Sequence, residues 1–381
     1  MSDNCTESDI TKCDINSGLN SNMSNKTVTG NIDIRLNSGK KKVNNRVSVD
    51  VDDCPASAYI MGLDDGTTGD YGSGVYTVTH SAIQASSSAT GSEIPAVTDY
   101  RYYGRNPNNY ICLDMEGQST CPDKHLYRII GSIYEEKENT NRLKVIKATP
   151  LTDGTTKWFS WDYKVNNGSG SCDNIWATIT NGNYSNSLTS GSQLMKLLNS
   201  GAWWNGISAN YYVRYNEDTK AITVNFTNYK LSDKAKSYIT TSRYYLGGYN
   251  GINSLTNEMY GYERGTLRYN TDRPLYWEGL VGLMYPSDYG YAAGNSCVSG
   301  TKLYYYSKGC MNKDWLYISN TYQWLMSPNS RDSHLVFGVY SSGYVGYDTY
   351  PVRSVSPVFF LNSSASIKGG EGTSAAPYTL S

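Results

Sequence analysis

Alternating hydrophobic and polar residues mark three β-strands in the first part of the chain. "NIDIRL" (31–36), "RVSVDVD" (46–52) and "GVYTVT" (74–79) place apolar side chains at every second position. A period of two is typical of a strand with one face in water. The polar segment "NSGKKKVNN" (37–45) has the composition of a turn between the first two strands. We therefore predict a small β-rich N-terminal module over residues 1–92, with an irregular start.

A serine-rich segment then interrupts these patterns. "ASSSATGSE" (85–93) has the composition of a flexible linker, and we place a domain boundary there. Beyond the linker, "LYRIIGSIYEE" (126–136) and "NRLKVIKAT" (141–149) are strand-like runs on either side of a polar turn. They predict a β-hairpin. The second domain is expected to cover residues 93–381.

Helical spacing appears twice in this second domain. Within "SGSQLMKLLNSGAWW" (190–204), leucines recur three and four residues apart after a serine start. The segment 231–246 begins with Ser232, a suitable N-cap for a second helix. From residue 277 onward the pattern is one of short strands and loops. The predicted fold class is α+β, with two helices plus short irregular β-sheets after a β-rich N-terminal module.

Composition adds an unusual aromatic preference to this picture. The 381 residues include 36 Tyr but only 5 Phe, and 18% of the residues are charged. Tyr, Ser, Asn, Gly and Thr dominate, which is typical of loop-rich and strand-rich extracellular proteins. An AT-rich genome by itself raises Tyr, but it raises Phe as well. The ratio therefore indicates that the phenol hydroxyl, or the tolerance of the ring for water, is used.

Charge and hydropathy exclude two classes of partner. There are 33 Lys and Arg against 34 Asp and Glu, a formal net charge of -1, and no long basic run occurs. Nucleic acid is therefore not expected as a partner. No apolar run reaches the length of about 18 residues that a membrane span needs. The start "MSDNCTESDI" lacks the basic and apolar parts of a secretory signal.

The eight cysteines include two pairs that are spaced to close short loops. These pairs are Cys112 with Cys121 and Cys297 with Cys310. Disulfides and free thiols both remain open, because the sequence does not fix the redox compartment. There is no C-x-x-C pair, which disfavours a zinc ribbon or a thioredoxin-like site.

Catalytic and metal-binding signatures are missing from the chain. It has no G-x-S-x-G, H-E-x-x-H or G-x-x-x-x-G-K motif, and its three histidines lack neighbouring ligands at metal spacing. The acidic tract "DDGTTGD" (64–70) lacks the spacing of a calcium loop and is expected to form a turn. We predict that the protein is not an enzyme and has no cofactor and no metal site.

Five motifs in the second domain carry a resemblance to a known family. They are, in order, "NPNNYICLDMEGQSTCPDKHLYRIIGSI", "LVGLMYPSDYGYA", "YQWLMSP", "VFGVYSSGYV" and "PVFFLNSSASIKGGEGTSAAPYTL". Together they resemble a family of uncharacterised surface-type domains from Gram-positive gut bacteria and their phages, which look like members of the C-type lectin fold superfamily. One departure is Ser356, which stands where the family usually has Arg, and Arg353 is the nearest residue able to substitute.

The resemblance implies three branches of that superfamily. Calcium-dependent sugar-binding members use Glu-Pro-Asn or Gln-Pro-Asp motifs, and neither occurs in this chain. Formylglycine-generating oxidases use a pair of close cysteines, whereas Cys297 and Cys310 are thirteen residues apart. The third branch comprises ligand-binding proteins diversified by retroelements, including phage receptor-binding proteins, whose C-terminal hairpin region carries the variable residues. This third branch fits the composition best.

The stretch "VFGVYSSGYVGYDTYPV" (336–352) has the pattern of such a hairpin. If Ser341 to Gly343 form the turn, with Gly343 at a positive φ, Tyr340 lies opposite Tyr344. One face then carries Phe337, Val339, Val345 and Tyr347, and we assign it to the core. The other face carries Tyr340, Tyr344 and two glycines, and it is left for solvent or a ligand.

Polar residues beside these rings complete a candidate binding surface, because mixtures of Tyr with Ser, Gly and Asn are typical of antibody-type binding sites. The predicted ligand-binding residues are Asn329, Arg331, Asp332, His334, Tyr340, Ser342, Tyr344, Asp348, Tyr350 and Arg353. We predict an adhesion or receptor-recognition protein of a bacterial cell surface or phage particle, extracellular, with an unknown protein or glycan receptor. Oligomerisation is left open. The alternatives are a structural surface or virion component whose Tyr-rich face is a subunit interface, and a cysteine-dependent oxidase.

Overall fold

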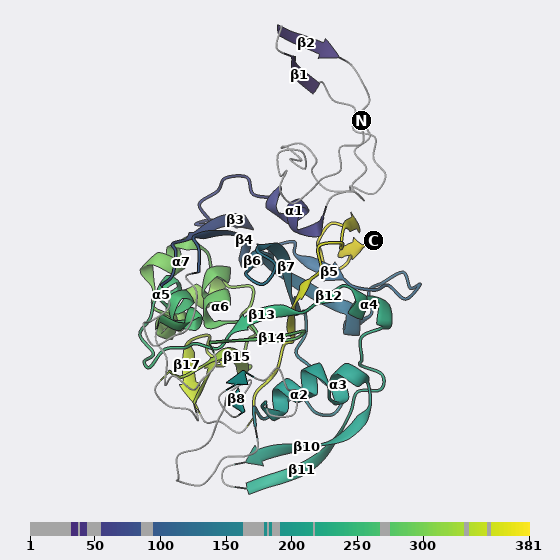
Figure 1. Cartoon of the computed structure of the whole chain (residues 1–381), viewed down its shortest axis with the longest axis vertical. Helices are drawn as coiled ribbons and strands as arrows, with labels where there is room; N and C mark the ends of the chain where they lie inside the picture. The colour runs from purple at the N-terminus through teal and green to yellow at the C-terminus, as the bar shows by residue number, and fades with distance from the viewer. Residues whose placement is uncertain are drawn as a thin grey trace.

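The computed structural model describes most of the chain (Figure 1). The described residues are 32–36, 39–43, 55–84, 94–162, 179–180, 183–184, 191–215, 218–266, 275–330, 335–348 and 352–381. Runs of strands are interspersed with short helices along this part of the chain, and the fold class is α+β as predicted. Among the described residues no helix has the length and apolar character that crossing a bilayer requires.

A nine-stranded mixed sheet forms the centre of the described part of the chain. Its strands follow the order β12, β18, β7, β6, β5, β20, β19, and β3 and β4 join the sheet through β6. Its members are β3 (Ser73–His80), β4 (Val97–Gly104), β5 (Tyr110–Cys112), β6 (Leu126–Glu135), β7 (Thr140–Lys147), β12 (Ile239–Thr240), β18 (Val358–Leu361), β19 (Ile367–Gly369) and β20 (Tyr378–Leu380). The predicted hairpin is confirmed as β6 and β7, which pair antiparallel.

The large sheet crosses the domain boundary predicted at residue 92. Strand β3 pairs with β4 over its whole length, from Ser73 opposite Gly104 to His80 opposite Val97. Helix α1 (Ala56–Met61) packs against β6 and β7. Residues 55–84 therefore share a sheet and a core with the chain after residue 93, which corrects the predicted boundary. The predicted linker, 85–93, lies outside the described residues.

Smaller sheets surround this centre. They are the pairs β1 (Ile32–Leu36) with β2 (Gly39–Val43), β8 (Ile179–Thr180) with β9 (Asn183–Tyr184), β10 (Ser208–Tyr215) with β11 (Asp218–Asn225) and β13 (Ser242–Tyr245) with β14 (Tyr276–Gly279), and the three-stranded sheet of β15 (Gln323–Pro328), β16 (Val336–Val339) and β17 (Val345–Asp348). The segment 37–45, predicted as a turn, instead contributes β2, because its lysines pair with β1. The predicted strand 46–52 lies outside the described residues.

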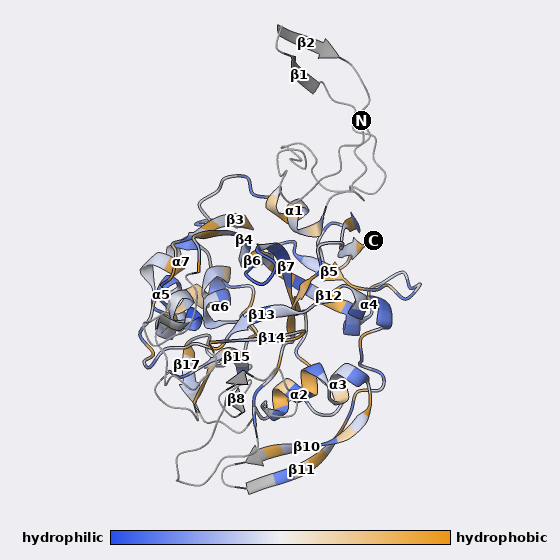
Figure 2. Ribbon diagram, viewed as in Figure 1, coloured by the Kyte–Doolittle hydropathy of each residue, from blue (hydrophilic) through white to orange (hydrophobic). Residues whose placement is uncertain are grey.

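The helices are more numerous and shorter than predicted. In the described part they are α1, α2 (Gln193–Asn199), α3 (Ala202–Asn205), α4 (Asp233–Ser237), α5 (Thr256–Gly261), α6 (Pro286–Ala292) and α7 (Asn295–Gly300), with the π turn η4 (Tyr262–Thr266) and the 3₁₀ turns η3 (Asp123–His125), η5 (Leu303–Lys308) and η6 (Cys310–Lys313). Ser232 caps α4 as predicted, but α4 ends early and β12 and β13 follow. Figure 2 shows α2 as largely hydrophobic and α4 as hydrophilic, in keeping with their different burial.

The prediction of only short strands and loops after residue 277 is wrong. Helices α6 and α7 lie there, and Figure 1 shows them gathered with α5 on one side of the molecule, near β17. Pro286 occupies the first turn of α6, a position that does not require its missing N–H. The sequence of α6 shows no amphipathic pattern, because its polar and apolar residues are all buried. Periodicity therefore did not predict this helix.

Asp288 anchors α6 to the large sheet through buried ion pairs. Its carboxylate lies 2.9 Å from the Arg101 guanidinium on β4 and 2.5 Å from the Lys144 ammonium on β7. It also accepts a hydrogen bond from the Tyr285 backbone N–H, which caps the helix. Burial raises the pKa of Asp288, but Lys144 and Arg101 more than offset this effect, so its pKa lies below the usual range. The carboxylate is therefore charged and fully compensated inside the core.

Replacing Asp288 by Asn should destabilise the protein strongly. The amide keeps the shape of the side chain but removes the negative charge, which leaves Lys144 buried without its counter-ion. We expect the free energy of unfolding to fall by about 3 kcal/mol or more. Urea denaturation at neutral pH measures the change, with Asp233→Asn on the exposed start of α4 as the control. Equal losses for the two variants would contradict the anchoring role.

A second buried carboxyl, Glu263, holds the other side of α6. Its two oxygens accept hydrogen bonds from the Ser287 backbone N–H and hydroxyl, at 2.8 and 2.5 Å. Burial raises the pKa of Glu263 to about 7, although the neighbouring Arg264 opposes the rise. Burial raises the pKa of Glu136, which faces Arg264 at 3.8 Å, to about 7 as well.

From the raised pKa values of Glu263 and Glu136 we predict that these two groups lower the free energy of unfolding as the pH rises from acid to neutral. Between their ordinary pKa of 4.5 and about 7, each of these two carboxyls binds more protons in the folded protein than in the unfolded chain. The free energy of unfolding should therefore fall as the pH rises through this window. Glu263→Gln and Glu136→Gln should each make the fall shallower, as measured by urea denaturation from pH 5 to pH 8. A slope that is unchanged in both variants would contradict the assignment.

Candidate functional site

The hairpin of β16 and β17 has the register that the sequence predicts. Phe337 lies opposite Tyr347, Gly338 opposite Gly346 and Val339 opposite Val345. The Tyr340 N–H donates to the Tyr344 carbonyl at 2.9 Å, which closes the turn. Gly343 has a φ of 85°, a conformation that favours glycine. The two faces of the hairpin are therefore the two that the sequence analysis distinguished.

The turn of this hairpin is docked onto the protein. The Tyr317 hydroxyl donates to the Ser341 carbonyl at 2.6 Å, and the Tyr289 hydroxyl of α6 donates to the Gly343 carbonyl at 2.8 Å. A Cβ at position 343 would lie 2.5 Å from the Met311 Cβ in η6. The turn is thus held between α6 and the segment that contains η5 and η6.

A continuous row of tyrosine rings runs across this junction. It consists of Tyr305, Tyr304, Tyr344, Tyr340 and Tyr322, which we call the tyrosine row. Successive ring centroids are 5.3, 5.2, 4.3 and 5.6 Å apart, and the 4.3 Å contact between Tyr344 and Tyr340 is stacked. The end members are the most exposed, with 39% of the surface accessible in both Tyr305 and Tyr322. Aromatic contacts at these distances stabilise one another.

Three members of the tyrosine row were not among the predicted site residues. Tyr304 and Tyr305 come from η5, and Tyr322 directly precedes β15. The run "YYY" at 304–306, inside the loop between two cysteines, was the available signal. It has no hairpin pattern of its own, and only the docking of the turn onto η5 brings these rings beside Tyr344.

Arg353 lies inside the protein rather than on its surface. It is fully buried, and its guanidinium carbon is 4.6 Å from the Tyr340 ring centroid and 5.2 Å from that of Trp324. A Cβ at Gly338 would lie 3.1 Å from the same guanidinium carbon. Arg353 therefore covers the glycine face of the hairpin and supports Tyr340 from within, which corrects its predicted place among exposed ligand-binding groups.

The other predicted ligand-binding residues are only partly accounted for. Asn329 is buried, and its backbone N–H donates to the Leu335 carbonyl. Ser342 is exposed at the turn, and Asp348 ends β17. Four predicted residues lie outside the described part of the chain, namely Arg331, Asp332, His334 and Tyr350. Of the predicted set, the structure thus brings Tyr340, Ser342 and Tyr344 together at one turn, with Arg353 beneath them.

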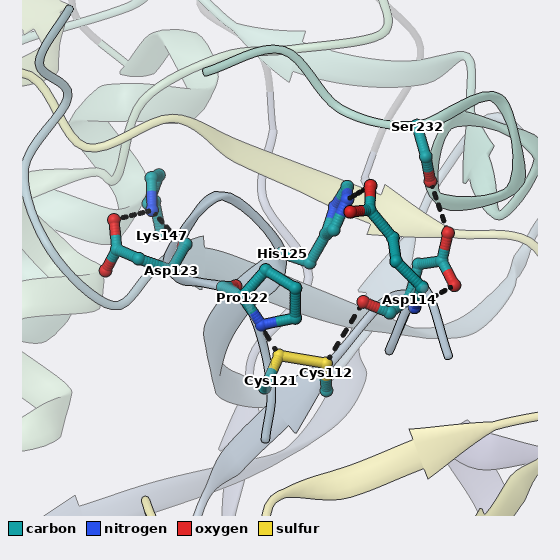
Figure 3. Close-up of a disulfide and its surroundings, with 9 residues drawn as sticks. Cys112, Asp114, Cys121, Pro122, Asp123, His125, Lys147 and Ser232 are labelled. Carbon is teal, nitrogen blue, oxygen red and sulfur yellow. Dashed lines mark hydrogen bonds and ion pairs between the residues drawn. A yellow bond between two sulfur atoms is a disulfide. The ribbon is translucent and has the colours of Figure 1, made fainter. Parts of the chain in front are cut away.

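Both predicted cysteine pairs are disulfide-bonded in the structure. Cys297 is joined to Cys310, which closes a thirteen-residue segment containing η5 and part of the tyrosine row. Cys112, the last residue of β5, is joined to Cys121 in a loop that Figure 3 shows. The first of these disulfides fixes the segment against which the hairpin turn is docked.

The loop of the second disulfide holds a small polar cluster. Ligand atoms of Asp114, Glu116 and His125 lie within 4.8 Å of one another. The Glu116 carboxylate is already 2.8 Å from the His125 Nε2 and 3.0 Å from the Lys124 ammonium. Asp114 accepts the Ser232 hydroxyl, as Figure 3 shows. Burial lowers the pKa of His125, although Glu116 opposes this effect. The contacts serve to pin the loop, and we assign no metal to them.

Comparison of the chain with protein-family models, curated proteins and solved structures yields no match.

Removing the Cys297–Cys310 disulfide should loosen the hairpin turn. Replacing both cysteines by Ser is expected to cost about 3 kcal/mol of stability, as expected for a loop of this size. Hydrogen exchange should quicken at the Gly343 N–H, which bonds to the Tyr340 carbonyl, more than at β6 amides. The matched control is the Cys112→Ser, Cys121→Ser pair. An equal effect of both pairs at Gly343 would contradict a specific support of the turn.

Proposed function

We propose that the protein is a ligand-binding or adhesion protein that recognises a receptor through the tyrosine row. The observation that carries this proposal is the contiguity of five tyrosines from three separate segments on a docked turn. Tyrosine offers a large contact area with few rotatable bonds, and its hydroxyl tolerates water. The exposed rings at both ends leave the row accessible to a partner.

The proposed scaffold is lectin-like and belongs to the retroelement-diversified branch. The motifs that carry the resemblance form β15, the β16–β17 hairpin and β18 in the last part of the chain. In this reading, the side chains of the hairpin region vary between sister proteins while the docked turn keeps its backbone. The two disulfides support an extracellular location on a bacterial surface or a phage particle.

Recognition is proposed in preference to catalysis because of where the perturbed acids lie. Asp99 and Asp288 are fully buried and held in ion pairs with Arg101 and Lys144. Such pairs stabilise the core and do not open onto a substrate. The disulfide between Cys297 and Cys310 also argues against the alternative of a cysteine-dependent oxidase, whose cysteines must react.

Substitution of the exposed ends of the tyrosine row should remove binding without unfolding the protein. Ligands are first selected with the wild-type chain from a glycan array and from a displayed library of random peptides. The double variant Tyr305→Ser, Tyr322→Ser should bind these ligands about tenfold more weakly or worse, because anchor aromatics dominate interfaces. Its Tm should change by only about 2 °C, because surface changes have small effects on stability.

The matched control removes exposed apolar groups elsewhere. Ile207 and Tyr212 lie beside and on β10, with 48% and 37% of their surface exposed, and Ile207→Ser, Tyr212→Ser should leave binding unchanged. Equal binding by the wild type and both variants would overturn the proposal. So would a wild-type chain that self-associates in light scattering while Tyr305→Ser, Tyr322→Ser is monomeric, because the row would then be a subunit interface.

A further inference from the structure

The segment closed by the Cys297–Cys310 disulfide contributes positive charge as well as rings to the tyrosine row. Lys302, Lys308 and Lys313 are all exposed on this segment and its continuation. The Lys308 ammonium lies 4.9 Å from the centroid of the Tyr305 ring. This placement combines a cation with one of the two exposed ends of the row.

These lysines are not engaged in ion pairs with the described part of the chain. In the described part of the chain, no ion pair joins any of the three to a carboxylate. The only acid between residues 297 and 320 is Asp314, which is buried and whose Oδ1 accepts the Leu316 N–H. Burial raises the pKa of Asp314 well above its usual range, although the Leu316 N–H and Arg128 oppose the rise. The hairpin adds one acid, Asp348, at the end of β17 away from the turn.

The geometry of the rings indicates which kind of partner suits this charge. Tyr344 and Tyr340 stack on each other at an interplanar angle of 16°. The other sides of this pair meet Tyr304 and Tyr322 and the buried Arg353. Tyr305 is flanked by Tyr304 and Lys308. Neighbouring rings and cations thus contact each member, so the half-buried central rings leave little open face on which a sugar or a nucleic acid base could stack, and the exposed aromatic surface lies at the end rings Tyr305 and Tyr322.

We propose that the partner of the tyrosine row is an acidic polypeptide segment, whose carboxylates pair with Lys302, Lys308 and Lys313 while its other side chains pack along the rings. This inference rests on the proposed function and specifies its class of ligand. Complementary charge at the rim of an interface mainly accelerates association and selects among partners. The formal net charge of the whole chain is -1, so the positive charge of these three lysines is a local feature and not a property of the whole protein.

Selection from a displayed library of random fifteen-residue peptides tests the proposal. Peptides retained by the full wild-type chain should be enriched in Asp and Glu over the starting library. The triple variant Lys302→Glu, Lys308→Glu, Lys313→Glu should bind them at least about tenfold more weakly. Binding to the wild type should also weaken between 0.05 and 0.5 M salt, because exposed charges are screened.

A matched triple variant separates this effect from net charge alone. Lys220, Lys234 and Lys368 are exposed on β11, α4 and β19, and their replacement by Glu should leave binding unchanged. If Tyr305→Ser, Tyr322→Ser loses the peptides while Lys302→Glu, Lys308→Glu, Lys313→Glu keeps them, the acidic partner is wrong and the proposed function stands. If both keep them, both proposals fail. Tighter binding of heparin or of an oligothymidylate than of the peptides would overturn the polypeptide assignment.

Discussion

The compensated charge of Asp288 is the constraint on which the arrangement of this protein depends. It fastens a seven-residue helix, α6, to two strands of the large sheet through Arg101 and Lys144. A buried carboxylate is tolerated only when its partners are in place, because desolvation is costly. The ion pairs of Asp288 therefore favour one position of α6 on the sheet over nearby alternatives. This position of α6 in turn places Tyr289, whose hydroxyl donates a hydrogen bond to the Gly343 carbonyl.

From this anchor the structure builds outward to an aromatic surface. Tyr289 and Tyr317 hold the hairpin turn, and Gly343 allows Met311 to approach it closely. The Cys297–Cys310 disulfide restrains the opposing segment, so rings that are distant in sequence meet in one row. A rigid display of this kind lowers the entropy lost when a partner binds. The surplus of Tyr over Phe is consistent with this arrangement, because many tyrosine hydroxyls donate hydrogen bonds to backbone carbonyl groups, as that of Tyr289 does.

Sequence patterns predicted the local elements better than their assembly. Strands β3, β6 and β7, the Ser232 helix cap and the register of the β16–β17 hairpin all follow from periodicity and capping. The domain boundary was placed between β3 and β4 because an alternating pattern shows that a segment is a strand but not which other strand it pairs with. Helix α6 was missed because burial of its polar residues removes the amphipathic signal.

The sequence by itself determined the α+β class, the hairpin with its two faces and the tyrosine-rich character of the chain. These features depend on side-chain alternation and turn chemistry, which act over a few residues. Only the tertiary structure decided which tyrosines share a surface, that Arg353 supports the hairpin from inside, and that Lys308 of the disulfide-closed segment borders the Tyr305 ring. The reason is physical, since these contacts join segments that the chain separates and that only burial of α6 and closure of the disulfide bring together.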